Sequence, residues 1–242
     1  MEDSLLLYLN NRMGKNEESY SSDDLFPGPV VTISREVGCA GLKLARKLSD
    51  KLNKGDSKRK WKVFSKEIFD ETARELEMDH QKLKNILKSE GRGTFDEILG
   101  ALGDKRFKSE RRIKKAVIDA IRSIAIDGYC IIVGRGGHLI AHDIKNALHV
   151  RFTAPLDWRM KKIVSSHKIS EQEALKFIDK TEKERESFRK NIRPVNLKEE
   201  LYDLNINVSV FANRDIVDLL EKAMYIKGLI KQQPVKKTTA AT

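Results

Sequence analysis

Short apolar runs alternate with longer amphipathic stretches between residues 29 and 228. Several of the runs are apolar throughout and rich in β-branched residues, which is typical of strands buried on both faces of a parallel sheet. The pattern predicts strands at 30–34, 61–64, 129–133, 148–152 and 204–210. Apolar residues at helical spacing predict helices between these strands. The order of elements therefore indicates an α/β fold, a parallel sheet with helices on both faces.

The strand predicted at 30–34 leads into a glycine-containing turn, Ser34 to Gly41, and a helix follows this turn. Ligands of parallel sheets bind at the carboxyl ends of strands. Glycines there let backbone N–H groups approach a phosphate, and the next helix adds its positive end. The turn lacks the G-x-x-x-x-G-K-[ST] spacing of a standard phosphate loop. On these residues alone, a phosphate-binding turn and an ordinary tight turn both remain open.

A second glycine turn, Gly134 to Gly137, follows the strand at 129–133 and places Arg135 between two glycines. An arginine at a strand end can bind a phosphate through two parallel hydrogen bonds. The alternative is a surface arginine in a flexible turn. The helix before this strand is predicted to end at Gly128, since glycine is the residue type that most often follows a helix.

The segment 156–195 is predicted to be helical and to break near Pro194, and it carries many arginines and lysines interleaved with acids. Phosphoryl transfer spreads negative charge over several oxygens, and arginines are a usual means of neutralising it. The alternative is an exposed helix whose charges are solvated. For most of these residues the exposed helix is the better interpretation.

The chain has 242 residues and a mass of 27.7 kDa, with 47 Lys and Arg against 36 Asp and Glu, a net charge of +11. This excess favours polyanionic partners such as nucleotides or nucleic acid, although solvated surface explains part of it. No apolar run approaches the roughly 18–20 residues that span a membrane, and the first residues do not resemble a secretory signal. We therefore expect a cytoplasmic protein that does not bind membranes.

The two cysteines, Cys39 and Cys130, exclude a disulfide scaffold and a cysteine-based zinc site. Both are most simply small buried residues, although the helix after the first glycine turn could partly activate the Cys39 thiol. Among the five histidines, only His138 and His142 have a metal-like spacing, and they lack a neighbouring carboxylate of the HExxH kind. The sequence assigns no metal ligand.

Four motifs, in order along residues 29–228, resemble the cytidylate kinase-like family of P-loop nucleoside monophosphate kinases. The first is VTISREVGCAGLKLARKLSDKL and the second is IIVGRGGHLI. The third is NALHVRFTAPLDWRMKKI, and the fourth is DKTEKERESFRK, followed by ELYDLNINVSVFANRDIVDLL. Each motif is modest by itself, and the specificity of the resemblance comes from their shared order.

The resemblance implies a three-layer P-loop kinase-like domain over residues 29–228, with a helical acceptor-binding insertion at about 65–104 and a helical lid at about 156–195. Residues 1–28 are expected to form a short helix and a linker, and residues 229–242 a disordered tail. The activity that the resemblance implies is ATP-dependent phosphoryl transfer, with Mg²⁺, to a nucleoside monophosphate such as CMP or dCMP or to a related small molecule.

The resemblance also assigns roles to residues. The ATP phosphates would be bound by Arg35, Glu36, Gly38, Cys39, Ala40, Gly41 and Leu42. The acceptor would be bound by Ser65, Lys66 and Arg135. The arginines that close over the reacting phosphates would be Arg159, Arg185 and Arg189 of the lid.

The first turn departs from the family, because Gly41 stands where cytidylate kinases carry the loop lysine, and no hydroxyl follows it to ligate Mg²⁺. Arg35 or Lys43 would have to supply the missing charge. We favour Arg35, which leaves the strand end beside the phosphate position, because two residues along a helix turn the Lys43 side chain by about 200°. Two alternatives stay open: a catalytically weak nucleotide-binding regulatory protein, and a nucleic-acid-binding protein that uses the basic segment 105–115.

Overall fold

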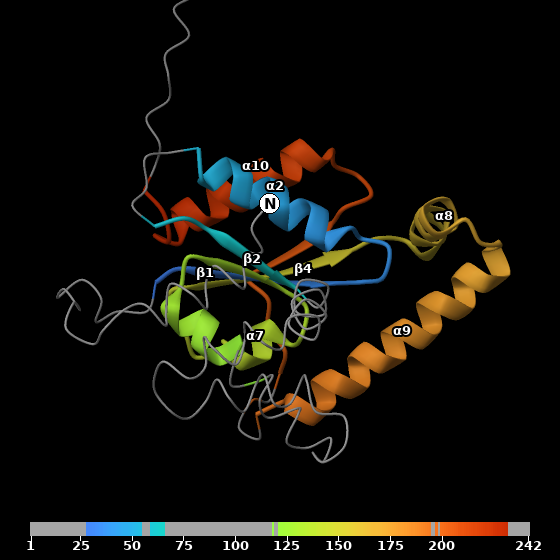
Figure 1. Ribbon diagram of the computed structural model, residues 1–242, viewed down its shortest axis with the longest axis horizontal. Helices are drawn as coiled ribbons and strands as arrows, with labels where there is room; N and C mark the ends of the chain where they lie inside the picture. Colours follow the sequence, from blue (N-terminus) through green and yellow to red (C-terminus); the bar gives the residue numbers. More distant parts are fainter. Residues whose placement is uncertain are drawn as a thin grey trace, which may run out of the picture.

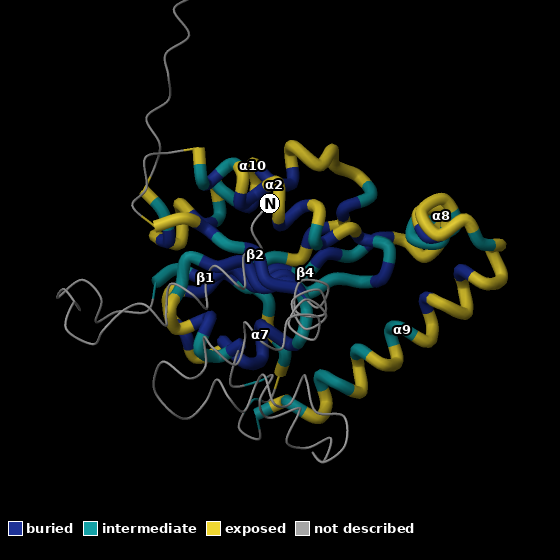
Figure 2. The backbone as a smooth tube through the Cα atoms, in the orientation of Figure 1, coloured by how far each residue is buried: buried dark blue, intermediate teal, exposed yellow. Residues whose placement is uncertain are grey.

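The computed structural model describes residues 28–54, 59–65, 118, 121–194, 197 and 199–231. These residues form a central sheet with helices on both faces (Figure 1). Among these residues, the central strands of the sheet are deeply buried (Figure 2). The predicted helix and linker of residues 1–28, most of the insertion at about 65–104 and most of the tail lie outside the described residues. Their domain boundaries therefore remain predictions.

Five parallel strands form the sheet in the order β2-β3-β1-β4-β5. They are β1 (Val30–Arg35), β2 (Lys62–Ser65), β3 (Cys130–Val133), β4 (Ala147–Thr153) and β5 (Leu204–Asn207). The central strands β1 and β3 are apolar because both of their faces are covered, and Val31, Ile33 and Ile131 have no exposed surface. The predicted parallel α/β fold is confirmed.

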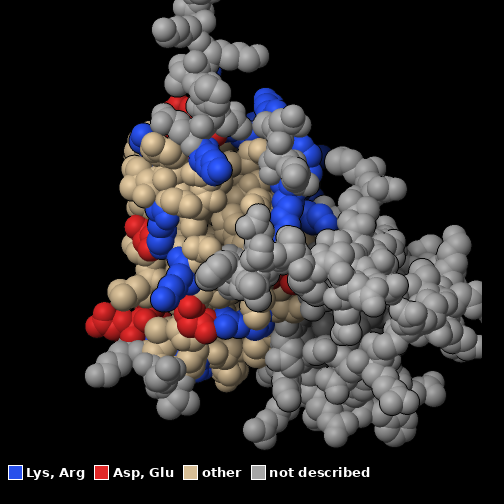
Figure 3. All heavy atoms as spheres, turned by 90° about the vertical axis from the view of Figure 1, so that its left-hand side faces the viewer, with Lys and Arg blue, Asp and Glu red and all other residues tan. Residues whose placement is uncertain are grey.

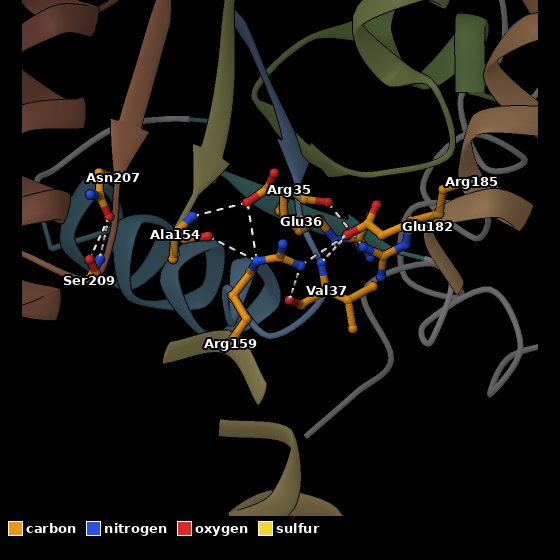
Figure 4. Close-up of polar contacts among 9 residues, drawn as sticks. All are labelled: Arg35, Glu36, Val37, Ala154, Arg159, Glu182, Arg185, Asn207 and Ser209. Carbon is orange, nitrogen blue, oxygen red and sulfur yellow. Dashed lines mark hydrogen bonds and ion pairs between the residues drawn. The ribbon is translucent and has the colours of Figure 1, made fainter. Parts of the chain in front are cut away.

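The prediction that the last strand extends to residue 210 is wrong, because β5 ends at Asn207. The side-chain oxygen of Asn207 accepts hydrogen bonds from the backbone N–H of Ser209 at 3.0 Å and from its hydroxyl at 2.6 Å (Figure 4). An asparagine that bonds to the backbone two residues further on forms a turn. The alternation of apolar residues therefore continues past the end of the strand.

Helices α2 (Gly41–Leu52) and α10 (Asn213–Ile226) cover one face of the sheet, and the short α7 (Gly137–Ile140) lies on the other (Figure 1). Residues 121–127 are also helical, and Arg122 donates to the carbonyl of Ile140 at 2.8 Å. Gly128, with a φ of 73°, follows these residues, as predicted. The apolar faces of these helices and the strands form one core.

The predicted helical segment 156–195 consists of two helices, α8 (Leu156–His167) and α9 (Glu171–Ile192). Lys168, with a φ of 55°, ends α8 in the left-handed conformation. Ser170 begins α9 with a capping box: its hydroxyl accepts from the N–H of Glu173, whose carboxylate accepts from the N–H of Ser170. The two helices form a hairpin that extends to one side of the sheet (Figure 1).

A small apolar cluster joins this hairpin to the rest of the molecule. Val37, from the first glycine turn, is packed with Ile163 of α8 and with Ala174 and Ile178 of α9. Much of the rest of α9 is exposed (Figure 2). In the part of the chain that the structure describes, no helix combines the length and the apolar content needed to cross a bilayer.

Candidate functional site

A cavity of about 480 Å³ lies at the carboxyl ends of β1 and β3, next to α9. Its lining comes from three segments: the end of β1 from Thr32 to Arg35, the second glycine turn from Gly134 to His138, and one face of α9. Carboxyl ends of strands are where parallel sheets bind ligands. The cavity is therefore the candidate functional site of the described residues.

Four arginines line this cavity: Arg35, Arg135, Arg185 and Arg189. Glu184 is the one acidic residue of the lining. Guanidinium groups are always charged and present paired N–H groups that match phosphate and carboxylate oxygens. The structure thus brings four of the arginines singled out in the sequence into one site, which is chemically suited to an anion.

The side chain of Arg35 lies between the two glycine turns. A methyl group at Gly134 would be 1.8 Å from Nη1 of Arg35, and one at Gly41 would be 3.1 Å from its Cγ. Gly134 also has a φ of 77°, which side chains rarely adopt. Two glycines therefore leave the space that Arg35 fills at the edge of the cavity.

The second glycine turn packs directly against α9. A methyl group at Gly136 would be 2.1 Å from Cδ1 of Ile192, and the guanidinium carbon of Arg135 lies 5.9 Å from the centre of the Phe188 ring. Arg135 itself has a φ of 51°. The absence of a side chain at Gly136 thus lets α9 approach, and an aromatic face lies within cation–π distance of Arg135.

The first glycine turn is held by hydrogen bonds to the end of β4 (Figure 4). The N–H of Glu36 donates to the carbonyl of Phe152 at 3.0 Å, and the Glu36 carboxylate accepts from the N–H of Ala154 at 3.0 Å. The same carboxylate lies 3.3 Å from Nε of Arg159. Glu36 is therefore engaged within the protein.

A carboxylate from α9 also reaches the first turn (Figure 4). Oε1 of Glu182 accepts a hydrogen bond from the N–H of Val37 at 2.6 Å and lies 3.8 Å from Nη1 of Arg159. Three residues further on, Arg185 donates to the carbonyl of Arg35 at 3.0 Å. Because a carboxylate and a phosphate use the same donors, Glu182 occupies an anion position at this turn.

Arg159 lies at the first turn and is not among the residues that line the cavity. Its Nε donates to the carbonyl of Ala154 at 2.9 Å and its Nη1 to the carbonyl of Val37 at 3.5 Å. Its side chain is 12% exposed. Arg159 thus connects α8 to the first turn and does not line the cavity that Arg185 and Arg189 line.

The remaining residues of the first turn differ in exposure. Cys39 is buried, and burial together with the negative charge of Glu36 raises the pKa of its thiol to about 11. The hypothesis that the helix activates this thiol is therefore wrong. Ala40 precedes α2 with a φ of 42°, and Lys43 is exposed on α2. Leu42 is partly buried.

Of the residues assigned to acceptor binding, Ser65 is buried at the end of β2 and Lys66 lies outside the described residues. Arg135 lines the cavity. Ser65 pairs with Val133 in the sheet, so it lies at the same edge as the second glycine turn.

Three residues that the sequence analysis did not assign to a site meet beside the cavity: His138, which lines it, Glu200 and Tyr202. Nε2 of His138 lies 3.2 Å from a Glu200 carboxylate oxygen and 2.9 Å from the Tyr202 hydroxyl. Burial lowers the pKa of His138, which is 5% exposed. In the sheet, Ile33 pairs with Val150, and Val150 pairs with Leu204, which follows Tyr202 by two residues. The proximity of Tyr202 to His138 therefore depends on the sheet register.

Comparisons with known proteins agree with this geometry. The model of the cytidylate kinase-like family matches residues 30–210. An uncharacterized protein from Eubacterium ventriosum has a similar fold, with 20% identity and a TM-score of 0.56, over 81% of this chain and 98% of its own. The search of curated proteins finds no match.

Two shikimate kinases are more distant. The enzyme from Bacteroides thetaiotaomicron has 12% identity and a TM-score of 0.42, over 81% of this chain and 98% of its own. The enzyme from Acinetobacter baumannii, in complex with shikimate, has 10% identity and a TM-score of 0.45, over 87% of this chain and all of its own, 100%. The family match over most of the chain establishes that this protein belongs to the cytidylate kinase-like family.

Proposed function

We propose that the protein transfers the γ-phosphoryl group of ATP to a small anionic acceptor, a nucleoside monophosphate such as CMP or dCMP. The observation that supports this most strongly is the set of four arginines in one cavity at the carboxyl edge of the sheet. They come from the end of β1, the second glycine turn and α9, so the fold gathers positive charge at one point. Family membership supports the same reaction class.

The chemistry of this transfer is positioning and charge neutralisation, without a covalent intermediate. An acceptor phosphate and the γ-phosphate repel each other, and guanidinium groups around both reduce that repulsion. We assign Arg135 to the acceptor phosphate and Arg35 to the oxygens between donor and acceptor, because Arg35 lies between the two turns. Arg185 and Arg189 reach the same cavity from α9.

Binding of ATP phosphates at the first turn requires an exchange of anions. Glu182 accepts the hydrogen bond of the Val37 N–H, so a phosphate oxygen must take its place there. The lysine that would add charge is replaced by Gly41. We assign that contribution to Arg35, since Lys43 is exposed on α2.

Mg²⁺ in kinases is held by one or two protein oxygens together with the substrate phosphates. Among the described residues, no three His, Cys, Asp or Glu side chains group as a complete metal site. Glu184 and Thr181 both line the cavity, and a carboxylate and a hydroxyl are hard oxygen donors that fit that mode. We assign them to the ion, which when bound would neutralise phosphate charge.

A second candidate function is nucleotide binding with little or no turnover, in a regulatory protein. The contact between Glu182 and Val37 favours it, because the protein's own carboxylate fills an anion position at the turn that lacks the family's lysine. In this reading the nucleotide acts as an effector, and its binding releases α9 from the first turn.

Transfer of ³²P from [γ-³²P]ATP to a panel of nucleoside monophosphates, with Mg²⁺, tests the proposal. We expect a labelled diphosphate from CMP or dCMP and a strong loss of product in Arg135→Ala. Binding of nucleotides without product would instead favour the regulatory candidate. Binding of RNA with a steep salt dependence, and no binding of nucleotides, would contradict both.

The distribution of basic side chains on the surface bears on the binding of RNA. In Figure 3, the Lys and Arg side chains of the described residues lie in several separate groups, with acidic and uncharged side chains between them. Nucleic-acid binding typically uses a continuous basic patch or stripe. The basic segment 105–115, on which the nucleic-acid alternative depends, lies outside the described residues. We base the function on the cavity arginines.

A further inference from the structure

Beside the cavity, one carboxylate contacts side chains from several elements. An oxygen of Glu200, which precedes β5, lies 3.2 Å from Nε2 of His138 on α7 and 3.4 Å from the hydroxyl of Tyr202. The same oxygen lies 3.7 Å from Nε of Arg189 on α9. A cavity arginine, a cavity histidine and a tyrosine therefore share this carboxylate.

The contact with Arg189 is made through Nε. A guanidinium held in this way still has two terminal NH₂ groups, with which it can bind a phosphate. The Glu200 and Arg189 side chains are 25% and 20% exposed, so water screens this ion pair only in part. The position of Arg189 in the cavity is thus coupled to the position of Glu200.

The sheet in turn holds Glu200. The hydroxyl of Tyr202, which contacts Glu200, lies 3.3 Å from the hydroxyl of Ser34 at the end of β1 and 2.9 Å from Nε2 of His138. The guanidinium carbon of Arg151, on β4, lies 5.7 Å from the centre of the Tyr202 ring. These contacts connect the carboxylate to rigid elements, whereas Arg189 belongs to α9, much of which is exposed.

We propose that Glu200 is a positioning residue: its carboxylate holds the Arg189 guanidinium at the cavity wall, and His138 and Tyr202 hold the carboxylate. This proposal rests on the proposed function, in which Arg189 binds a phosphate of the substrates. Ordering a long side chain before the ligand arrives reduces the entropy lost on binding. Glu200 therefore acts through Arg189 and does not touch the substrate.

A double-mutant cycle tests the proposal through the affinity for CMP, measured by titration calorimetry. We expect Glu200→Gln to weaken CMP binding by about 3- to 10-fold, a usual range for coupled neighbours. In the Arg189→Ala background, Glu200→Gln should change the affinity less than about twofold. Equal effects of Glu200→Gln in both backgrounds would overturn the proposal. Asp179→Asn is the control, since Asp179 pairs with Lys183 on the same helix and is exposed.

A second measurement does not depend on any substrate. The Nε resonance of Arg189, assigned by its loss in Arg189→Lys, reports the charge that lies 3.7 Å from this atom in the free protein. It should shift in Glu200→Gln and keep its position in Asp179→Asn. An unchanged resonance in Glu200→Gln would overturn the positioning role. If the protein does not bind CMP, the proposed function fails, and this resonance still decides the role of Glu200.

Discussion

The two glycine turns follow neighbouring strands of the same sheet, yet they differ in what their surroundings provide. At the first turn, the Glu36 carboxylate is engaged by Ala154 and Arg159, and the N–H of Val37 donates to Glu182. The second turn lines the cavity and places Arg135 there. Similar glycine patterns therefore lead to one turn closed by the protein's own carboxylates and another that lines a cavity with four arginines.

The difference arises from the residues between the glycines and from the helix that covers them. The first turn carries an acid and the apolar Val37, which is buried between α8 and α9. The second turn carries the basic residue Arg135, and Gly136 lets α9 approach closely. A single helix, α9, therefore contacts both turns, through Glu182 at the first and through Phe188 at the second.

Arg35, which lies between the turns, gives the largest expected effect. Arg35→Ala should lower kcat/KM by about 10²- to 10³-fold, the usual cost of removing one group that stabilises transition-state charge. Lys43→Ala should change it by less than about threefold, since Lys43 is exposed. Steady-state kinetics of both variants, with equal melting temperatures as the control, check this. A larger loss in Lys43→Ala than in Arg35→Ala would show that Lys43, and not Arg35, supplies the charge.

The closed state of the first turn predicts slow alkylation of Cys39. Its pKa of about 11, against 9.0 for an ordinary thiol, lowers the thiolate fraction at pH 8 by about 100-fold. Because the thiolate forms as pH rises towards the pKa, the rate should increase tenfold per pH unit through pH 10 without levelling. Mass spectrometry after iodoacetamide treatment at several pH values measures this. A rate that levels near pH 9 would show that the turn is open.

The second turn predicts a loss of acceptor binding. Arg135→Ala should weaken CMP binding by about 1.5–3 kcal/mol, the range for a hydrogen bond to a charged group. Arg214→Ala is a matched control, because the Arg214 side chain on α10 is 91% exposed. Titration calorimetry of both variants gives the comparison. If Arg135→Ala binds each monophosphate as the parent does, Arg135 is only a surface residue.

The smallest expected effect concerns Glu182. Glu182→Gln removes the charge that competes with phosphate for the Val37 N–H, and ATP should then bind about 3- to 10-fold more tightly, since a neutral acceptor holds the N–H less strongly. The control is Asp179→Asn, at an exposed acidic residue on the same helix. Calorimetry with ATP and Mg²⁺ measures the change. An unchanged or weaker affinity would mean that Glu182 does not compete with the nucleotide.

Much of the fold could be predicted from the sequence, because apolar β-branched runs mark buried parallel strands closely. The exceptions have local causes. The Asn207 turn interrupts an alternation that continues in the sequence. The break between α8 and α9 contains neither glycine nor proline, and the one signal for it was the Ser170 to Glu173 capping box.

The site could be predicted only in part. Arg35 ends β1 and Arg135 follows β3, and Arg185 and Arg189 lie four residues apart on one helix, so topology and helical spacing bring them together. Two other features could not be predicted. The contact of Glu182 with the first turn depends on how α9 packs. The meeting of His138 with residues 200 and 202 depends on the register of β4 and β5.

The central claim is that the second turn, and not the first, receives the acceptor's phosphate in the free protein. Backbone amide chemical shifts of ¹⁵N-labelled protein, recorded as CMP is added and then ATP with Mg²⁺, test it most directly. We predict that CMP alone shifts the amides of Gly134, Arg135 and Gly136, whereas the Val37 amide shifts only after ATP is added. Shifts of Val37 with CMP alone, or no shifts at the second turn, would contradict the claim.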